Sequence, residues 1–332
     1  MLIKVQYIKR ISIEMFGIFV IPLTNKPIHS MLRDKIIEIF VKTDDFCQEF
    51  DLQIKQHLLE NKRCNSRNRA CSLSDAEIIS ILILFQFGQF TNFKSYYTQY
   101  VQPHLSDMFP DLVSYNRFVE LQKRVAVPMM LFIKTHCMGK SRGLNFIDST
   151  HLKVCHNRRI HCHKVFNGVA ERGQCSIGWF YGFKLHLIIN DCGEILSFYL
   201  TKGNVDDRNK EMILSMTENI FGYLVGDKGY ISKALSDLLF GNGIQMLTKP
   251  RKNMKGYNLT NQEKILLRKR AIIECVNDEL KNMCKIQHTR HRSINNFLMN
   301  LMGALAAYHF FPKKPSLNIK FEDQTSQLFL VA

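Results

Sequence analysis

The sequence predicts a mixed α/β protein in which a helical N-terminal region precedes a sheet with helices on its faces. Three observations lead to this fold class. Apolar residues recur at helical spacing within residues 31–140, strand-like apolar runs begin near residue 141, and strands then alternate with helices. The chain has 332 residues, enough to bury a full core and to form about two domains.

Residues 31–140 are predicted to be mainly helical. The run Ser-Asp-Ala-Glu at 74–77 has the form of a capping box and opens an apolar helix. Further helices are predicted at 93–101 and 115–124. The first helix opens at Met31, and its apolar residues are spaced as on one helical face: Leu32, Ile36, Ile37, Phe40 and Val41.

The helical region has two interpretations. Its last helix carries Arg117, Lys123 and Arg124, which suits a helix-turn-helix-like module that lays one helix in a DNA major groove. A helical bundle with a solvated basic face explains the same residues, and spacing alone leaves both interpretations open. We expect a helical DNA-binding domain at 31–140.

The first 30 residues are expected to precede the folded part of the chain. Their apolar run, Met15 to Leu23, is about half the ~20 residues that a spanning helix needs. No small-x-small cleavage site follows it, so neither a membrane span nor a signal peptide is indicated. Residues 1–30 are therefore interpreted as an N-terminal extension or the product of a mis-assigned start.

The bulk composition favours an intracellular protein that binds nucleic acid. The formal charge is +16, from 45 Lys and Arg against 29 Asp and Glu, and such a surface attracts polyanions. A hydrophobic content of 46% excludes wholesale disorder. Ten cysteines lack paired CxxC spacing, which fits reduced thiols in a cytoplasm. With no membrane span predicted, DNA is the expected partner.

Strands are predicted from residue 141 onward. The apolar run Leu144 to Asp148 indicates a buried strand that ends in a carboxylate, and residues 179–189 are rich in aromatic and β-branched residues. Residues 190–193 are typical of a hairpin turn into a strand at 194–200. The remaining elements alternate: a helix at 208–220, a strand at 223–226, a helix at 232–240 stopped by Gly241-Asn242-Gly243, a strand at 245–248 and a helix at 271–285.

Three acidic residues stand in settings that suit metal-ion chemistry. Asp148 and Asp227 each end an apolar strand-like run, and Glu274 lies early in a helical stretch. Two strand-end aspartates and one helix-borne glutamate can hold a pair of Mg²⁺ ions around a phosphodiester. In a chain this basic, we expect that phosphodiester to be DNA.

Glu274 lies in the most basic part of the chain. Arg270, Glu274, Asp278 and Lys281 share one helical face. A surface helix with charge pairs explains this face as well, although Arg N-terminal to Glu is the weaker order for helix stability. Residues 249–292 hold twelve Lys and Arg against four Asp and Glu, half of the net charge of the chain. This field favours a glutamate that meets a DNA backbone.

These residues resemble a known family, the DDE-type insertion-sequence transposases. Arg270-x3-Glu274-x6-Lys281 resembles the Arg, Glu and Lys part of the motif Tyr-x2-Arg-x3-Glu-x6-Lys, and Leu267 stands where that motif has tyrosine. Asp148 and Asp227 look like its first two carboxylates. Met31 to about Phe311 is similar to the bacterial insertion-sequence family numbered 982, in the segments 146–150, 154–159, 182–186 and 203–208.

The resemblance implies a ribonuclease H-like (retroviral-integrase-like) catalytic core at 141–311, followed by a tail at 312–332. It implies two Mg²⁺ or Mn²⁺ ions held by Asp148, Asp227 and Glu274, with Asp148 bridging both. Hydrolysis at the transposon ends and transfer of the freed 3′-OH into target DNA would follow. The implied assembly is a homodimer or larger complex on paired DNA ends, associated with the nucleoid.

Several basic side chains are candidates for contact with DNA. Arg270 and Lys281 are expected to grip phosphates. Lys184 and His186 alternate on one predicted strand face, where they point at DNA or are half-buried strand residues. His288 and His291 are assigned to a basic tail that contacts the DNA backbone. The remaining candidates are Arg158, Arg159, Arg208 and Arg292.

Rival interpretations remain for two clusters and for the function. Asp206 and Asp207 are metal ligands or, more simply, helix caps. The function itself is a transposase, a structure-specific nuclease or resolvase on the same core, or a DNA-binding relative that does not cut. The second cluster has no usual zinc-finger spacing and more simply forms a DNA-facing loop; it comprises Cys155, His156, His161, Cys162, His163 and Cys175.

Overall fold

The computed structural model describes residues 26–60, 72–88, 90–176, 178–250, 259–287 and 291–317. Most of the expected N-terminal extension and of the C-terminal tail lies outside these residues. The chain divides into two compact units. The first unit comprises residues 1–136, 283–286 and 293–310, and the second comprises residues 137–282, 287–292 and 311–332.

A long helix packed on a short apolar helix forms the base of the first unit. Helix α2 (Lys26–Glu60) begins five residues before Met31, where the sequence pattern opened it. It buries Ile36 and Ile39 but leaves Ile37 and Val41 exposed, so the buried stripe is narrower than predicted. Helix α3 (Asp75–Phe85) has the predicted capping box at its N-terminus and is buried along almost its whole length.

Aromatic packing organises the short helices of the first unit. The ring of Phe118 lies 4.7 Å from that of Tyr97 and 5.4 Å from that of Phe93. The remaining elements of the unit are α4 (Phe93–Tyr96), the π-helix η1 (Tyr97–Val101), α5 (Gln102–His104), α6 (Tyr115–Leu121), α7 (Ala126–Phe132), the π-helix η2 (Ile133–Cys137) and α12 (Ile294–His309).

The predicted major-groove helix is shorter than expected, and two of its three basic residues, Arg117 and Arg124, form contacts within the protein. Helix α6 ends at Leu121, so Lys123 and Arg124 lie beyond it. Arg117 pairs with Glu120 at 2.9 Å, while Arg124 donates to the carbonyl oxygen of Leu73 at 3.2 Å and pairs with Asp75. These contacts are compatible with a helical bundle that has a basic face, and the DNA-binding role of residues 31–140 stays a prediction.

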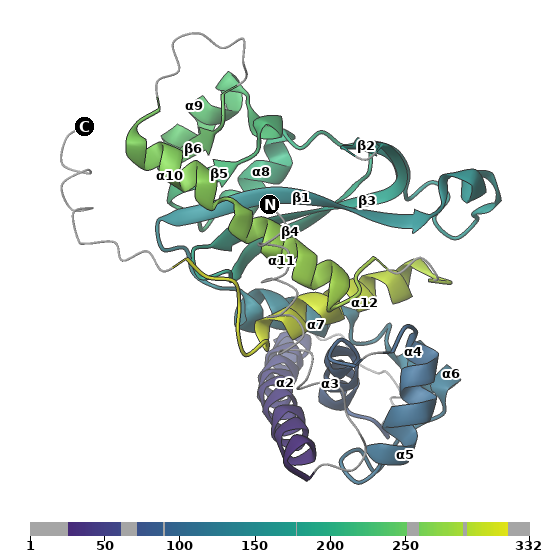
Figure 1. The fold of residues 1–332 in the computed structure, drawn as a ribbon. Helices are drawn as coiled ribbons and strands as arrows, with labels where there is room; N and C mark the ends of the chain where they lie inside the picture. The colour runs from purple at the N-terminus through teal and green to yellow at the C-terminus, as the bar shows by residue number, and fades with distance from the viewer. Residues whose placement is uncertain are drawn as a thin grey trace. The chain divides into compact units, whose positions relative to one another are not determined.

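The second unit contains one mixed sheet (Figure 1). Its strand order is β2-β3-β1-β5-β6, and β4 also pairs with β3. β1 is antiparallel to β3 and parallel to β5, and β5 is parallel to β6. The predicted mixed α/β fold is confirmed. The strands are β1 (Leu144–Cys155), β2 (Glu171–Cys175), β3 (Gly178–Asn190), β4 (Ile195–Lys202), β5 (Gly222–Gly226) and β6 (Ile244–Thr248).

Helices cover both faces of this sheet. Ile147 of β1 packs in an apolar cluster with residues of α8 (Lys210–Thr217) and α9 (Lys233–Gly241). Successive side chains of a strand point to opposite faces, so Asp148 lies on the other face. That face is covered by α11 (Ala271–Asn282), which packs on β1 and follows α10 (Asn261–Lys269).

Helix α12 belongs to the first unit, although the predicted catalytic domain extended to residue 311. The helix is apolar around most of its circumference and packs against α3 and α7. At Gly303 a Cβ atom would lie 3.0 Å from the carbonyl oxygen of Leu82, so the two backbones approach closely. A helix buried on most sides needs other helices as neighbours, and the first unit supplies them.

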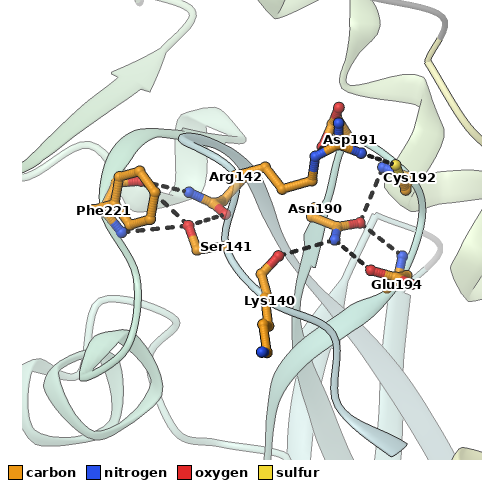
Figure 2. A network of polar contacts seen from close by, with 9 residues as sticks. Lys140, Ser141, Arg142, Asn190, Asp191, Cys192, Glu194 and Phe221 are labelled. Atoms are coloured by element: carbon orange, nitrogen blue, oxygen red, sulfur yellow. Dashed lines mark hydrogen bonds and ion pairs between the residues drawn. The ribbon is translucent and has the colours of Figure 1, made fainter. Parts of the chain in front are cut away.

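The β3–β4 hairpin is held by one buried side chain (Figure 2). Asn190 accepts hydrogen bonds from the backbone N–H groups of Cys192 and Glu194, at 3.0 and 2.9 Å. Its Nδ2 donates to the carbonyl oxygen of Lys140 and to the Glu194 carboxylate. The predicted turn at 190–193 is confirmed, with Gly193 at φ +71° in the left-handed region.

A second buried amide fixes β1 to β5. Asn145 is fully buried, and its Nδ2 donates to the carbonyl oxygens of Phe221 and Tyr223, at 2.9 and 3.1 Å. Its Oδ1 accepts from Ser141 Oγ at 3.0 Å. Because every polar atom of this amide is paired, it binds the start of β5 in a single register.

We expect Asn145→Ala to lower the free energy of unfolding by about 2–3 kcal/mol, since two buried carbonyl oxygens lose their donor. Urea unfolding at neutral pH measures this difference. Asn219→Ala, which removes an exposed amide from the same unit, is the matched control and should change stability by less than about 0.5 kcal/mol. Equal losses in the two variants would contradict the assignment.

Candidate active site at the end of β1 and β5

Asp148 and Asp227 occupy equivalent positions on neighbouring parallel strands. Phe146 of β1 pairs with Val225 of β5. Asp148 lies two residues after Phe146, and Asp227 lies two residues after Val225. Side chains two residues apart share a face, so both carboxylates point to the side covered by α11. Asp227 follows β5 directly with an extended backbone, at φ −76° and ψ 169°.

Asp148 does not end its strand, in contrast to the prediction. β1 continues to Cys155 because its antiparallel pairing with β3 extends far beyond the last pair with β5. The Asp148 side chain is 21% exposed, whereas Asp227 is exposed. The two carboxylates therefore differ in environment, although they share a register.

Arg270 joins Asp148 to Glu274. Its Nη2 donates to Glu274 Oε1 at 2.7 Å, and its Nη1 lies 3.6 Å from Asp148 Oδ1. Nη1 is buried and makes no hydrogen bond to the described residues. Arg270 stands between α10 and α11, where the chain passes from one helix to the next. One guanidinium thus lies between two of the predicted carboxylates.

Asn277 is a site residue that the sequence analysis missed. Its Nδ2 donates to Asp148 Oδ2 at 3.0 Å, and its side chain is buried on α11. Asp278, which the helical spacing placed on this face, is exposed and accepts a hydrogen bond from Asn282. The signal was available, since position 277 is three residues after Glu274 and therefore one turn away.

Burial raises the pKa of Asp148 to about 6, with Arg270 opposing the shift and the negative charges of Asp227 and Glu274 adding to it. Both carboxylates are therefore close enough to Asp148 to influence its charge. Burial also lowers the pKa of Lys281, and the charge of Asp148 opposes that shift.

Among the described residues, no group of three or more His, Cys, Asp or Glu side chains is arranged to hold a metal ion. For the carboxylates the geometric reason is that Arg270 lies between Asp148 and Glu274. The same finding applies to the six cysteines and histidines of the zinc interpretation, all of which are described.

Tyr230 lies three residues after Asp227 and is buried in the apolar cluster that contains Ile147. Burial raises the pKa of Tyr230 well above its usual value, and the charges of Asp207 and Asp148 add to this shift.

Lys184 and His186 are not both available to DNA. His186 is fully buried and its Nε2 lies 2.9 Å from Thr201 Oγ1, so the DNA-facing interpretation of this histidine is wrong. Lys184 is half-buried, and its Nζ donates to Asp207 Oδ1 at 3.0 Å and to the carbonyl oxygen of Val205 at 2.9 Å. Both Lys184 and His186 are therefore strand residues whose side chains contact groups within the protein.

Asp206 and Asp207 do not cap the helix that follows them. Helix α8 begins at Lys210 and is capped by Asn209, whose side chain accepts from the N–H of Met212. Asp206 instead accepts two hydrogen bonds from the Arg208 guanidinium, at 3.0 and 2.7 Å. These bonds lower the pKa of Asp206 to about 2. The aspartates stabilise the loop before α8 rather than its first turn.

The other predicted DNA contacts lie on the surface. Arg158 and Arg159 are exposed on a 3₁₀ helix, η3 (Asn157–Cys162), and Arg292 is exposed after α11. His288 lies outside the described residues. No described helix is long and apolar enough to cross a membrane.

Residues 138–294 match the family model described as the transposase DDE domain. All three predicted carboxylates fall within the matched residues, together with Arg270 and Lys281. The match supports the predicted DDE-type DNA transposase. Comparison with curated proteins gives no match.

Two solved structures are similar to the chain. The cryo-EM structure of the piggyBac transposase synaptic complex with hairpin DNA has a TM-score of 0.43 and 10% identity, and covers 82% of this chain and 71% of that chain. The crystal structure of the Mos1 strand transfer complex has a TM-score of 0.23 and 11% identity, and covers 79% of this chain and 84% of that chain.

The buried His186 makes the stability of the second unit depend on pH. Burial lowers the pKa of His186 to about 4, so the unfolded chain takes up a proton at a higher pH than the folded chain. The contribution of His186 is therefore complete above about pH 6.5 and is lost as the pH falls toward 4. We expect the stability of the wild type to fall more steeply there than that of His186→Gln, by up to about 1.4 kcal/mol per pH unit.

Urea unfolding at a series of pH values measures the two slopes. His161→Gln, which changes an exposed histidine, is the control and should keep the wild-type slope. Parallel slopes for wild type and His186→Gln would show that the buried imidazole is not the source.

Proposed function

We propose that the chain is the transposase of an insertion sequence and that it cuts and joins DNA at Asp148, Asp227 and Glu274. The observation that carries this proposal is the placement of Arg270 between Asp148 and Glu274, beside a second aspartate at the equivalent position of the neighbouring strand. The transposase DDE domain match supports it. We assign the core to the ribonuclease H-like class because three antiparallel strands continue into two parallel strands.

The acidic residues have the chemistry of ligands for divalent metal ions, although in the described residues they are not arranged as a metal site. Carboxylate oxygens are the ligands that Mg²⁺ and Mn²⁺ prefer. Asp148 carries a raised pKa, because burial and two neighbouring carboxylates disfavour its charge. The Arg270 Nη1 atom that faces it is 3.6 Å away and makes no hydrogen bond to any residue that the structure describes. The site thus holds more negative charge than its own cation neutralises, a state that a bound cation relieves.

Asp148, Asp227 and Glu274 would hold two Mg²⁺ or Mn²⁺ ions. Bound there, the ions supply activation of the attacking hydroxyl and stabilisation of the leaving oxygen in phosphodiester cleavage and joining. The chain itself positions the reacting groups. Asn277 orients the Asp148 carboxylate, and Arg270 and Lys281 offer positive charge to DNA phosphates.

The rest of the chain is assigned to DNA. In this proposal the first unit binds the ends of the element, and two or more copies hold a pair of ends together. We propose DNA contacts for Arg158, Arg159, Arg208 and Arg292, which are exposed in the second unit. In this proposal Lys184 contacts DNA as part of its ion pair with Asp207.

Charge-neutral substitutions test the carboxylates. We expect Asp148→Asn and Glu274→Gln to reduce strand transfer at least a hundredfold, with Mg²⁺ and pre-cut DNA ends carrying the inverted repeats that flank the coding region. DNA binding should stay within about twofold. Asp278→Asn is the matched control, because it removes an exposed acid of the same helix. Unchanged activity in Asp148→Asn would refute the assignment.

The same assay separates the rival functions. Joined products support the transposase, whereas cleavage without joining supports a structure-specific nuclease or resolvase. Binding without either product identifies a relative that does not cut.

Metal binding has a readout that needs no DNA. A ligand that binds only the folded state stabilises it, by about 2.7 kcal/mol at a hundredfold excess over Kd. We expect Mg²⁺ or Mn²⁺ to raise the unfolding temperature of the wild type and of Asp278→Asn. Asp148→Asn should lose most of this rise, because it removes one of the proposed carboxylate ligands. An equal rise in all three proteins, measured by thermal unfolding with and without the ion, would place the metal elsewhere.

A further inference from the structure

A cleft of about 540 Å³ opens in the second unit between the β2–β3 hairpin and the loop that joins β4 to α8. Its walls come from Arg172 to Gln174, Trp179, Lys184, Gly203 to Arg208 and Gly229. Asp148, Asp227 and Glu274 do not line this cleft.

Trp179 is the most informative residue of this cleft. It is the single tryptophan of the chain, and 62% of its surface is exposed. Its backbone is held in β3 by pairing with Gln174, and its carbonyl oxygen accepts from Asn157 Nδ2 at 2.7 Å. A tryptophan on a fixed strand, with its ring open to solvent in a cleft, offers a flat surface for stacking another ring.

The floor of the cleft is built to be narrow and polar. A Cβ atom on Gly173 would lie 2.1 Å from the carbonyl oxygen of Gly203, so β2 and the end of β4 meet without room for side chains. Beside this contact the Lys184–Asp207 pair offers both a donor and an acceptor. Such groups hydrogen-bond to the edge of a nucleobase.

Arg172 adds a cation at the rim. It is exposed, and no ion pair of Arg172 is found within the described part of the chain. Arg208, in contrast, is held by two hydrogen bonds to Asp206. Arg172 is therefore the cation best placed to follow a phosphate into the cleft.

The cleft borders the proposed catalytic residues through Gly229. This glycine stands two residues after Asp227 in the short 3₁₀ helix η4 (Lys228–Tyr230). A Cβ on it would approach only the Asp207 carboxylate, at 3.9 Å, so this wall is open. A strand with a phosphate at Asp227 can therefore place an adjacent nucleotide in the cleft.

We infer that this cleft binds one unpaired nucleobase of a DNA strand, stacked on Trp179, with the adjoining phosphate near Arg172. The inference rests on the proposed function for the identity of the strand. The occupant is a base and not only a backbone, because an aromatic ring gives little attraction to a phosphate.

The single tryptophan makes the site directly observable. We expect a single-stranded oligodeoxynucleotide to quench the fluorescence of the full-length protein, because Trp179 is its only tryptophan. An oligonucleotide of the same length and charge made of abasic sites should bind with little quenching. Equal quenching by the two would show that only charge is sensed, and the absence of quenching at saturation would also overturn the inference.

Two substitutions complete the test. Trp179→Ala should weaken binding of the single strand about 5- to 100-fold, the range of base–aromatic stacking, and leave duplex binding unchanged. Trp179→Tyr should restore most of the affinity, since it keeps a ring. An unchanged affinity in Trp179→Ala refutes the inference, whatever the strand-transfer assay shows. Failure of strand transfer in the wild type, with base-dependent quenching intact, removes the proposed transposase and leaves the base site.

Discussion

The candidate site depends on the hydrogen bonds of a single buried amide. Asn145 reaches from β1 to the carbonyl oxygens of Phe221 and Tyr223, and so fixes which residues of β5 lie opposite β1. A shift of one residue would turn every side chain of β5 to the other face. Gly222 reinforces the register, because its φ of +77° and its approach to Gly143 exclude a side chain. Asp148 and Asp227 are neighbours as a result of these contacts.

The consequence is a concentration of acids that the fold only partly compensates. Burial disfavours the charge of Asp148, and the two other carboxylates disfavour it further, while Arg270 opposes both effects. Partly compensated charges lower the stability of the folded state, and groups with shifted pKa values cluster at functional sites. Asn277 Nδ2 donates to Asp148 Oδ2, but Asn277 Oδ1 and Arg270 Nη1 are buried without a hydrogen bond to the described residues, so the polar groups around Asp148 are only partly paired.

Much of this arrangement could be predicted from the sequence, and the failures have physical causes. Apolar runs located the strands, and the spacing from Arg270 to Glu274 gave their ion pair. The length of β1 could not be predicted, because its second half is held by β3, which is distant in sequence. The predicted catalytic domain extended to residue 311, whereas residues 293–310 belong to the first unit, because the apolar surface of α12 shows only that the helix is buried, not where.

The side chains at the site were harder to predict than the backbone. Asn277 and Asp278 both lie about one turn from Glu274, and only tertiary packing decides which of them faces β1. A charged residue at such a position attracts attention in a sequence, whereas an amide does not. The same bias favoured Asp206 and Asp207 as caps, whereas Asn209, which stands directly before Lys210, is the residue that caps α8.

Arg270 links the electrostatics of the site to its proposed chemistry. Its guanidinium lies 2.7 Å from Glu274 Oε1 and 3.6 Å from Asp148 Oδ1, and both carboxylates are proposed as ligands of a divalent ion. Under that proposal, a dication would supply these oxygens with more charge at shorter distance than a guanidinium does. Arg270 would then offer its positive charge to DNA phosphates, so the same residue would serve both the carboxylates and the substrate.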